Sequence, residues 1–252
     1  MQLKKNLLTV FVALFVFGCS QNASTVKKLS KQEQTDLYRE LGVRYYQLGH
    51  LEDAKEKLTK ALEINPKDPQ THNTLGVLYG RLGEMDIAKK HFDIAISLAP
   101  EDAKIKNNFG RFLCEQGKYS QAEKYLRSAA NDPTNQIQWQ VLTNLGHCKL
   151  LQGHKQKAIL YFKKALLQNP KHAPALLAMA KIYYDDGKYM SARAFLERFF
   201  SASGKFQSAD SLYLGYRIET ALNAEKQAEQ YRTSLLRQFP DSPEAKKVLL
   251  EK

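Results

Sequence analysis

The chain has 252 residues, of which 43% are hydrophobic and 25% charged, with three cysteines and eight prolines. These proportions exclude a disordered chain, a collagen-like chain and a small cysteine-stapled domain, and they supply enough apolar side chains for a buried core. The formal net charge of +12 draws attention to acidic partners. Because the lysines are scattered and do not alternate with aromatic residues in one stretch, we interpret the charge as a solvated surface and expect no nucleic-acid binding.

The first nineteen residues have the features of a secretory signal peptide. Lys4 and Lys5 precede an apolar run over residues 7–17, which is too short for a spanning helix of about twenty apolar residues. The run ends in Gly18-Cys19, an arrangement that resembles the lipobox of bacterial lipoproteins. The resemblance implies that Cys19 is lipidated and becomes the mature N-terminus. The alternative is an ordinary signal peptide that contains a cysteine.

The residues after Cys19 bear on where the chain is anchored. Ser20 stands where an aspartate commonly retains lipoproteins in the inner membrane, so the resemblance implies the periplasmic face of the outer membrane. Acyl chains contribute roughly 0.8 kcal/mol per buried methylene, so a three-chain anchor would be effectively permanent. Residues 20–34, rich in Ser, Gln, Lys and Thr, are expected to form a flexible tether.

From residue 35 onwards, one pattern recurs at steps of 34, 34, 36, 34 and 35 residues. A large apolar residue is followed by a small one at Leu41-Gly42, Leu75-Gly76, Phe109-Gly110, Leu145-Gly146, Met179-Ala180 and Leu214-Gly215. An alanine follows each pair, and prolines close most units. The pattern resembles the tetratricopeptide repeat, six times over.

The repeat pattern has a physical explanation. Small residues such as Gly42 and Ala54 let two antiparallel helices approach closely, Leu58 fills the gap, and Pro66 stops the second helix. We predict an all-α, right-handed superhelical solenoid in which each helical hairpin covers the apolar face of the next. The repeats are expected at 35–68, 69–102, 103–138, 139–172, 173–207 and 208–240, with a short capping helix within 241–252. Residues 131–137 and 201–205 are expected to form irregular loops.

The sequence holds no motif typical of an enzyme. Phosphate-binding glycine loops, dinucleotide fingerprints, His-Glu-x-x-His, Gly-x-Ser-x-Gly and Cys-x-x-Cys are all absent. The six histidines lie on different repeats without ligand spacing, so we expect no metal site. We therefore interpret the chain as a non-enzyme without a small-molecule substrate, and with no cofactor other than the lipid on Cys19.

Cys114 and Cys148 are candidates for a disulfide. They fall on the first helices of the third and fourth repeats, which stack about 8 to 10 Å apart axis to axis. Export would place them where disulfides persist. Two buried free thiols are the alternative.

The first helices of such a solenoid face its concave side and line a groove that usually binds peptides. The positions expected to line it include Arg39, Val43, Tyr46, Asn73, Val77, Asn107, Arg111, His147, Lys181 and Tyr184. Some of these resemble a clamp for a terminal carboxylate, but Val43 stands where that clamp has asparagine. A groove that binds an extended or helical segment through apolar contacts, with basic groups at its edge, fits better.

A narrower resemblance rests on the stretch from Asn107 to Gly117 and on Asn144-Leu145-Gly146-His147-Cys148. These residues, with the lipobox and the six repeats, resemble the type IV pilus biogenesis lipoproteins of the PilF and PilW family, the pilotins. The resemblance implies a protein that binds the pilus secretin subunit, localises it to the outer membrane and promotes its assembly into a multimer. It also supports the bridge between the two cysteines. The alternative is a general outer-membrane scaffold that recruits cell-wall hydrolases or envelope-assembly factors.

Overall fold

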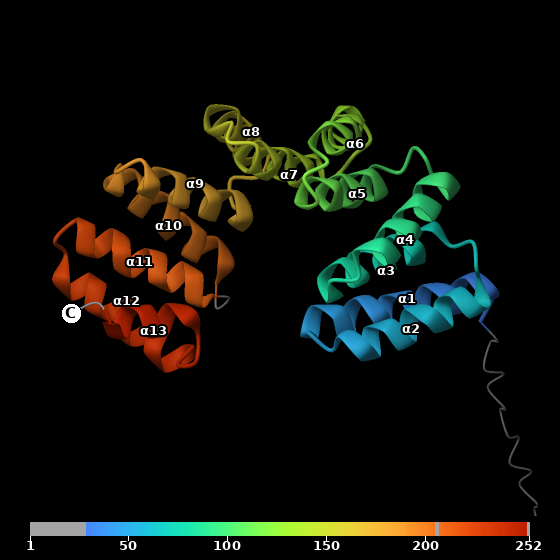
Figure 1. The fold of residues 1–252 in the computed structure, drawn as a ribbon, viewed down its shortest axis with the longest axis horizontal. Helices are drawn as coiled ribbons and strands as arrows, with labels where there is room; N and C mark the ends of the chain where they lie inside the picture. The colour runs from blue at the N-terminus through green and yellow to red at the C-terminus, as the bar shows by residue number, and fades with distance from the viewer. Residues whose placement is uncertain (1–28, 205–206, 251–252) are drawn as a thin grey trace, which may run out of the picture.

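Six stacked helical hairpins make up the described part of the chain, residues 29–204 and 207–250, in this computed structural model (Figure 1). The first helices of the hairpins are α1 (Lys31–Leu48), α3 (Pro69–Leu82), α5 (Ala103–Glu115), α7 (Gln138–Leu151), α9 (Ala173–Asp185) and α11 (Ala209–Ala221). The second helices are α2 (Leu51–Ile64), α4 (Met85–Leu98), α6 (Tyr119–Asn131), α8 (Lys155–Gln168), α10 (Tyr189–Ser203) and α12 (Glu225–Gln238). A last helix, α13 (Pro243–Leu250), follows them. The predicted all-α solenoid of six hairpins is confirmed.

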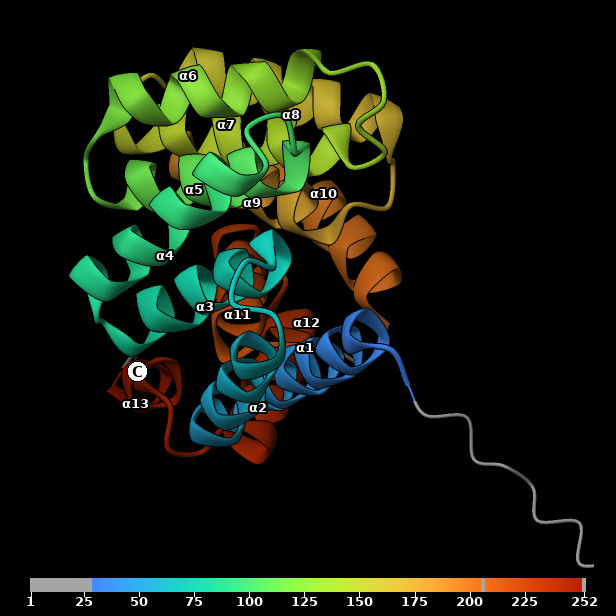
Figure 2. The same ribbon diagram turned by 90° about the vertical axis from the view of Figure 1, so that its right-hand side faces the viewer.

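The hairpins follow an arc. In Figure 1, α5 and α7 lie on its inner side, and α6 and α8 lie on its outer rim. Figure 2, turned by 90°, also shows the middle hairpins above the first hairpin and the last helices, so the two ends lie on the same side of the arc. The expected signal peptide, Cys19 and most of the expected tether fall within 1–28, outside the described residues.

The small residues of the repeat pattern stand where two helices touch. A Cβ atom added at Gly110 would lie 2.7 Å from Cγ of Leu126, and one at Gly146 would lie 2.6 Å from the ring of Phe162. Both partners are fully buried. Each large side chain of the second helix therefore occupies the space that the glycine leaves on the first.

The turn inside each hairpin is made by a residue with positive φ. Gly49, Gly83, Gly117, Gly153 and Gly187 have φ values from 71° to 83°, a conformation that glycine adopts without steric cost. In the sixth hairpin Asn223, with φ of 55°, takes this place, and asparagine is among the few other residues that tolerate it.

The C-terminal helix covers the end of the solenoid. Ala245 and Val248 of α13 are fully buried and belong to one apolar cluster with Leu212 of α11 and Leu235 of α12. The predicted capping helix therefore packs against the last hairpin, as the exposed apolar face of a terminal repeat requires.

The first helix begins earlier than predicted. Residues 31–34, expected in the tether, are helical because Ser30 and Glu33 form a capping box. The Ser30 side chain accepts from the amide of Glu33 at 3.1 Å, and the Glu33 carboxylate accepts from the amide of Ser30 at 2.7 Å.

The two expected loops differ in outcome. Residues 132–137 do form a loop, closed by Asn135, whose Nδ2 donates to the carbonyl of Ala129 at 2.7 Å. Residues 201–203, in contrast, continue α10 because Phe199 and Phe200 pack into the core and the Phe200 ring stacks on Tyr231 at 5.7 Å. Lys205 lies outside the described residues.

Candidate protein-binding groove

Two neighbouring hollows open between the first helices of the first four hairpins. One, which we name the tyrosine hollow, has about 200 Å³ and is walled by Tyr46, Val77, Arg81 and Arg111. The other, which we name the disulfide hollow, has about 340 Å³ and lies between α5 and α7, over Cys114 and Cys148. The structure thus brings together Tyr46, Val77, Arg111 and His147 of the predicted set. Val43 is half-buried on α1 and lines neither hollow.

An ion pair separates the two hollows. Nη1 of Arg111 lies 2.6 Å from Oε1 of Glu115, one turn further along α5, and both side chains line both hollows. Their side chains are 39% and 51% exposed. Because exposed ion pairs contribute about 0–1 kcal/mol, Arg111 can readily exchange Glu115 for another carboxylate.

Tyr46 is held by an arginine of the next hairpin. The guanidinium of Arg81 lies 5.0 Å from the centre of the Tyr46 ring, and its Nη1 donates to the Tyr46 carbonyl at 3.4 Å. Stacking of this kind contributes roughly 0.5–1 kcal/mol at an exposed site and orients the guanidinium. No carboxylate of the described residues pairs with Arg81.

His147 lines the disulfide hollow and contacts the core. The edge of its ring meets Phe162, with ring centres 5.1 Å apart, while part of the residue stays open to solvent. Desolvation by the surrounding protein and the positive charge of Lys181 lower the pKa of His147 below its usual value. The ring is therefore mainly neutral at neutral pH.

Asn73 and Asn107, expected to line the groove, are buried. They are 1% and 4% exposed. Nδ2 of Asn108 donates to Oδ1 of Asn73 at 3.1 Å, and Nδ2 of Asn144 donates to Oδ1 of Asn107 at 2.8 Å. These hydrogen bonds join consecutive first helices, so Asn73 and Asn107 stabilise the stack and are not open to a partner.

Arg39 likewise joins two hairpins. Its guanidinium lies 2.5 Å from Asp36 and 2.9 Å from Asp68, the buried N-cap of α3. Burial alone would raise the pKa of Asp68, but hydrogen bonds from Thr71 and Arg39 outweigh it and lower the pKa. Arg39 therefore stabilises the contact between the first two hairpins.

Lys181 and Tyr184 lie further along the arc, on α9. Nζ of Lys181 pairs with Oδ2 of Asp210 at 2.6 Å. The guanidinium of Arg217 lies over the Tyr184 ring, 4.7 Å from the ring centre. Neither residue lines the two hollows, so the predicted set divides into a group at the first four hairpins and a group at the last two.

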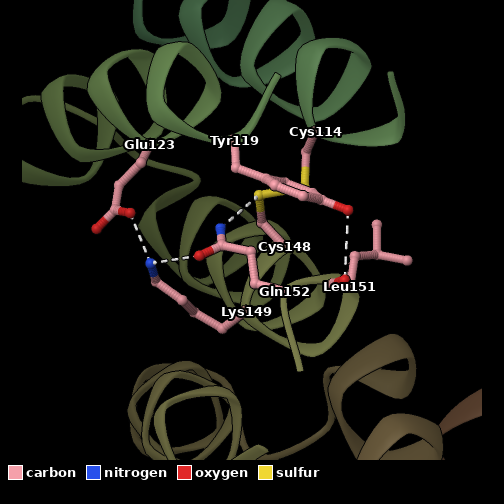
Figure 3. Close-up of a disulfide and its surroundings, with 7 residues drawn as sticks. All are labelled: Cys114, Tyr119, Glu123, Cys148, Lys149, Leu151 and Gln152. Atoms are coloured by element: carbon pink, nitrogen blue, oxygen red, sulfur yellow. Dashed lines mark hydrogen bonds and ion pairs between the residues drawn. A yellow bond between two sulfur atoms is a disulfide. The ribbon is translucent and has the colours of Figure 1, made fainter. Parts of the chain in front are cut away.

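The structure joins Cys114 and Cys148 by a disulfide, with Cα atoms 5.7 Å apart (Figure 3). Around it, the Tyr119 hydroxyl donates to the carbonyl of Leu151 at 3.3 Å, and Nζ of Lys149 lies 2.6 Å from Glu123. Both cysteines are almost fully buried. The disulfide ties the third hairpin to the fourth beneath the groove surface.

Several residues of the hollows were not predicted from the sequence, namely Arg81, Glu115 and Leu151. Arg81 falls outside the helix positions taken to face the groove, and its placement depends on Tyr46, 35 residues away. Glu115 had a local signal, since it stands four residues after Arg111 on one helix.

Within residues 29–204 and 207–250, no helix has the length and apolar character needed to cross a bilayer. The same residues contain no group of three or more metal-binding side chains.

Stacked helical hairpins with a groove along their first helices define the class of tetratricopeptide-repeat proteins. Models described as TPR repeat and tetratricopeptide repeat match residues 37–83 and 73–136. A model of the middle TPR-like domain of cilia and flagella-associated protein 70 matches residues 115–238.

The similarity extends to particular proteins. The chain is 32% identical to the type IV pilus assembly protein PilF of Pseudomonas aeruginosa, over 97% of this chain and 98% of PilF. The solved structure of Pseudomonas aeruginosa PilF has a TM-score of 0.69 at 33% identity, covering 88% of this chain and 99% of that one. The crystal structure of PilW, a widely conserved type IV pilus biogenesis factor, has a TM-score of 0.71 at 28% identity, covering 85% and 98%. The chain therefore belongs to the PilF family of type IV pilus biogenesis proteins.

Proposed function

We propose that this chain is an outer-membrane lipoprotein that binds the secretin subunit of the type IV pilus and promotes its assembly into a multimer. The observation that carries the proposal is the 32% identity to PilF over 97% of the chain. The two hollows between the first helices support it, because they offer apolar and charged surface to a bound polypeptide segment.

In this proposal the chain acts by binding alone, with no catalytic step, small-molecule substrate or cofactor beyond the lipid on Cys19. The lipid confines the groove to the periplasmic face of the outer membrane. Capture of a secretin subunit then becomes recruitment to the membrane, because confinement raises the effective concentration of subunits there.

Secretin assembly in cells tests the proposal. We would delete the coding region, restore it as wild type, Tyr46→Ala or Tyr161→Ala, and measure secretin multimers in the membrane fraction. Tyr161 is a half-buried tyrosine on the outer-rim helix α8 and serves as the matched control. We expect loss of multimers on deletion, restoration by wild type and Tyr161→Ala, and a several-fold deficit with Tyr46→Ala. Normal multimers in the deletion strain would contradict the proposal.

The anchor is tested separately. Cys19→Ala should release the chain from membranes while leaving the repeats folded, because the apolar core is formed by side chains of the helices themselves. A variant that still sediments with membranes would argue against lipidation.

The alternative scaffold function predicts different partners. Capture of the full-length chain from solubilised envelopes would recover cell-wall hydrolases or envelope-assembly factors without secretin. Recovery of secretin favours the assembly function instead.

A further inference from the structure

The two hollows form one continuous surface with two different characters. They share Arg111 and Glu115, so a segment that crosses this ion pair contacts both. Their volumes of about 200 and 340 Å³ lie below, or at the lower end of, the range of roughly 300–1,000 Å³ typical of small-molecule pockets. They suit individual side chains of a bound polypeptide better than a free small molecule.

The tyrosine hollow has an excess of positive charge. Arg81 and Arg111 both line it, and Glu115 is its one carboxylate. Arg81 is oriented by the ring of Tyr46 and has no carboxylate partner among the described residues. Arg111 is paired only with Glu115, through an exposed contact. An incoming carboxylate would therefore meet one unpaired guanidinium and one whose present partner is readily displaced.

The disulfide hollow has a different chemistry. Its walls are Leu150, Leu151 and the two bonded cysteines, with the side chains of Asn144 and His147 at its border. His147 is mainly neutral at neutral pH because its pKa is lowered, so the shared ion pair supplies the only formal charges here. Leu151 is 57% exposed. An apolar side chain placed here would remove this leucine from water.

We propose that the paired hollows select a partner segment that carries an acidic side chain beside a large apolar one, the acid binding Arg81 and Arg111 and the apolar group packing over the Cys114–Cys148 disulfide. This inference rests on the proposed function, since it specifies the kind of secretin segment that the groove accepts. Charge complementarity favours an acidic segment, because a basic one would leave Arg81 unpaired and face a second guanidinium.

A peptide library tests the selectivity without any assumption about the secretin. We would pan a displayed library of random peptides against the full-length chain in detergent, as wild type, Arg81→Glu and Lys157→Glu. Lys157 is an exposed lysine on the outer-rim helix α8 and gives the matched charge reversal. We expect peptides enriched in Asp or Glu next to Leu, Ile or Phe from wild type and Lys157→Glu, and loss of the acidic enrichment with Arg81→Glu. Peptides without an acidic bias, or equal selections from all three proteins, would overturn the inference.

The apolar half has its own matched pair of variants. Leu151→Asp alters the disulfide hollow, whereas Leu160→Asp alters a leucine of similar exposure, 52%, on α8. Binding of a selected peptide should weaken at least tenfold with Leu151→Asp and less than twofold with Leu160→Asp. Equal effects of the two changes would refute the apolar contact.

Secretin binding separates this inference from the proposed function. If the purified secretin subunit binds wild type and Arg81→Glu equally, the inference fails while the proposed function stands. If wild type selects acidic–apolar peptides but does not bind the secretin, the selectivity of the surface stands and the proposed partner is wrong.

Discussion

Removal of the disulfide is expected to weaken the middle of the solenoid. The bond joins residues 34 apart, and the chain-entropy model assigns roughly 4 kcal/mol to a cross-link that closes a loop of this length. We expect the double variant Cys114→Ala, Cys148→Ala to lose about 2–4 kcal/mol in the free energy of unfolding. Since each hairpin contacts only its neighbours, the loss should concentrate in the third and fourth hairpins.

The assay combines urea unfolding with hydrogen exchange resolved by helix. The oxidised wild type is compared with the reduced wild type and with the double variant. Both perturbed proteins should unfold at lower urea, with the largest loss of amide protection in α5 to α8. An unchanged unfolding midpoint would refute the assigned stabilisation, and a uniform loss of protection along all helices would refute its local character.

Two further predictions concern packing and pH. Gly110→Ala should destabilise the protein by about 1–2 kcal/mol in urea unfolding, because the new Cβ would lie 2.7 Å from buried Leu126. Gly80→Ala is the control, since its Cβ would meet no atom closer than 3.7 Å, and a greater loss there than at Gly110 would contradict the packing argument. Desolvation and the charge of His72 lower the pKa of His91 from 6.5 to about 4. The unfolded chain therefore protonates His91 at a higher pH than the folded one does. The free energy of unfolding should fall by roughly 1–2 kcal/mol as the pH drops from about 6.5 to about 4. His91→Phe should flatten the dependence between about pH 7 and pH 5, and an equally steep profile in that variant would count against His91 as its source.

The repeat period predicted every hairpin because it records a local steric requirement. A small residue must face a large one where two helices touch, and this requirement recurs at fixed spacing, as at Gly110 and Leu126. The start of α1 also had a local signal, the capping box of Ser30 and Glu33. The extension of α10 had none, because Phe199 and Phe200 hold it through contacts with other helices.

The sequence indicates the surface on which the two hollows lie, but not the detail of that surface. Helix periodicity indicates which face a residue occupies, and Tyr46, Val77 and Arg111 of the predicted set line one hollow. Periodicity does not indicate how closely the next hairpin approaches. The close approach of the neighbouring hairpin buries Asn73 and Asn107. Pairing of an amide with an amide about 35 residues away is a tertiary event that periodicity leaves open.

The hydrogen-bonded asparagine pairs set the register between consecutive first helices, and so the spacing of the side chains on the surface above them. If one first helix slid along its neighbour by a turn, the amides of Asn73 and Asn107 would lose their partners inside the protein, at about 1–3 kcal/mol for each unsatisfied group. The spacing between successive first helices is thus already fixed in the unbound protein. A ligand that matches this spacing binds without a free-energy cost for rearranging the helices. A ligand that does not match must bear that cost, and its affinity is lower.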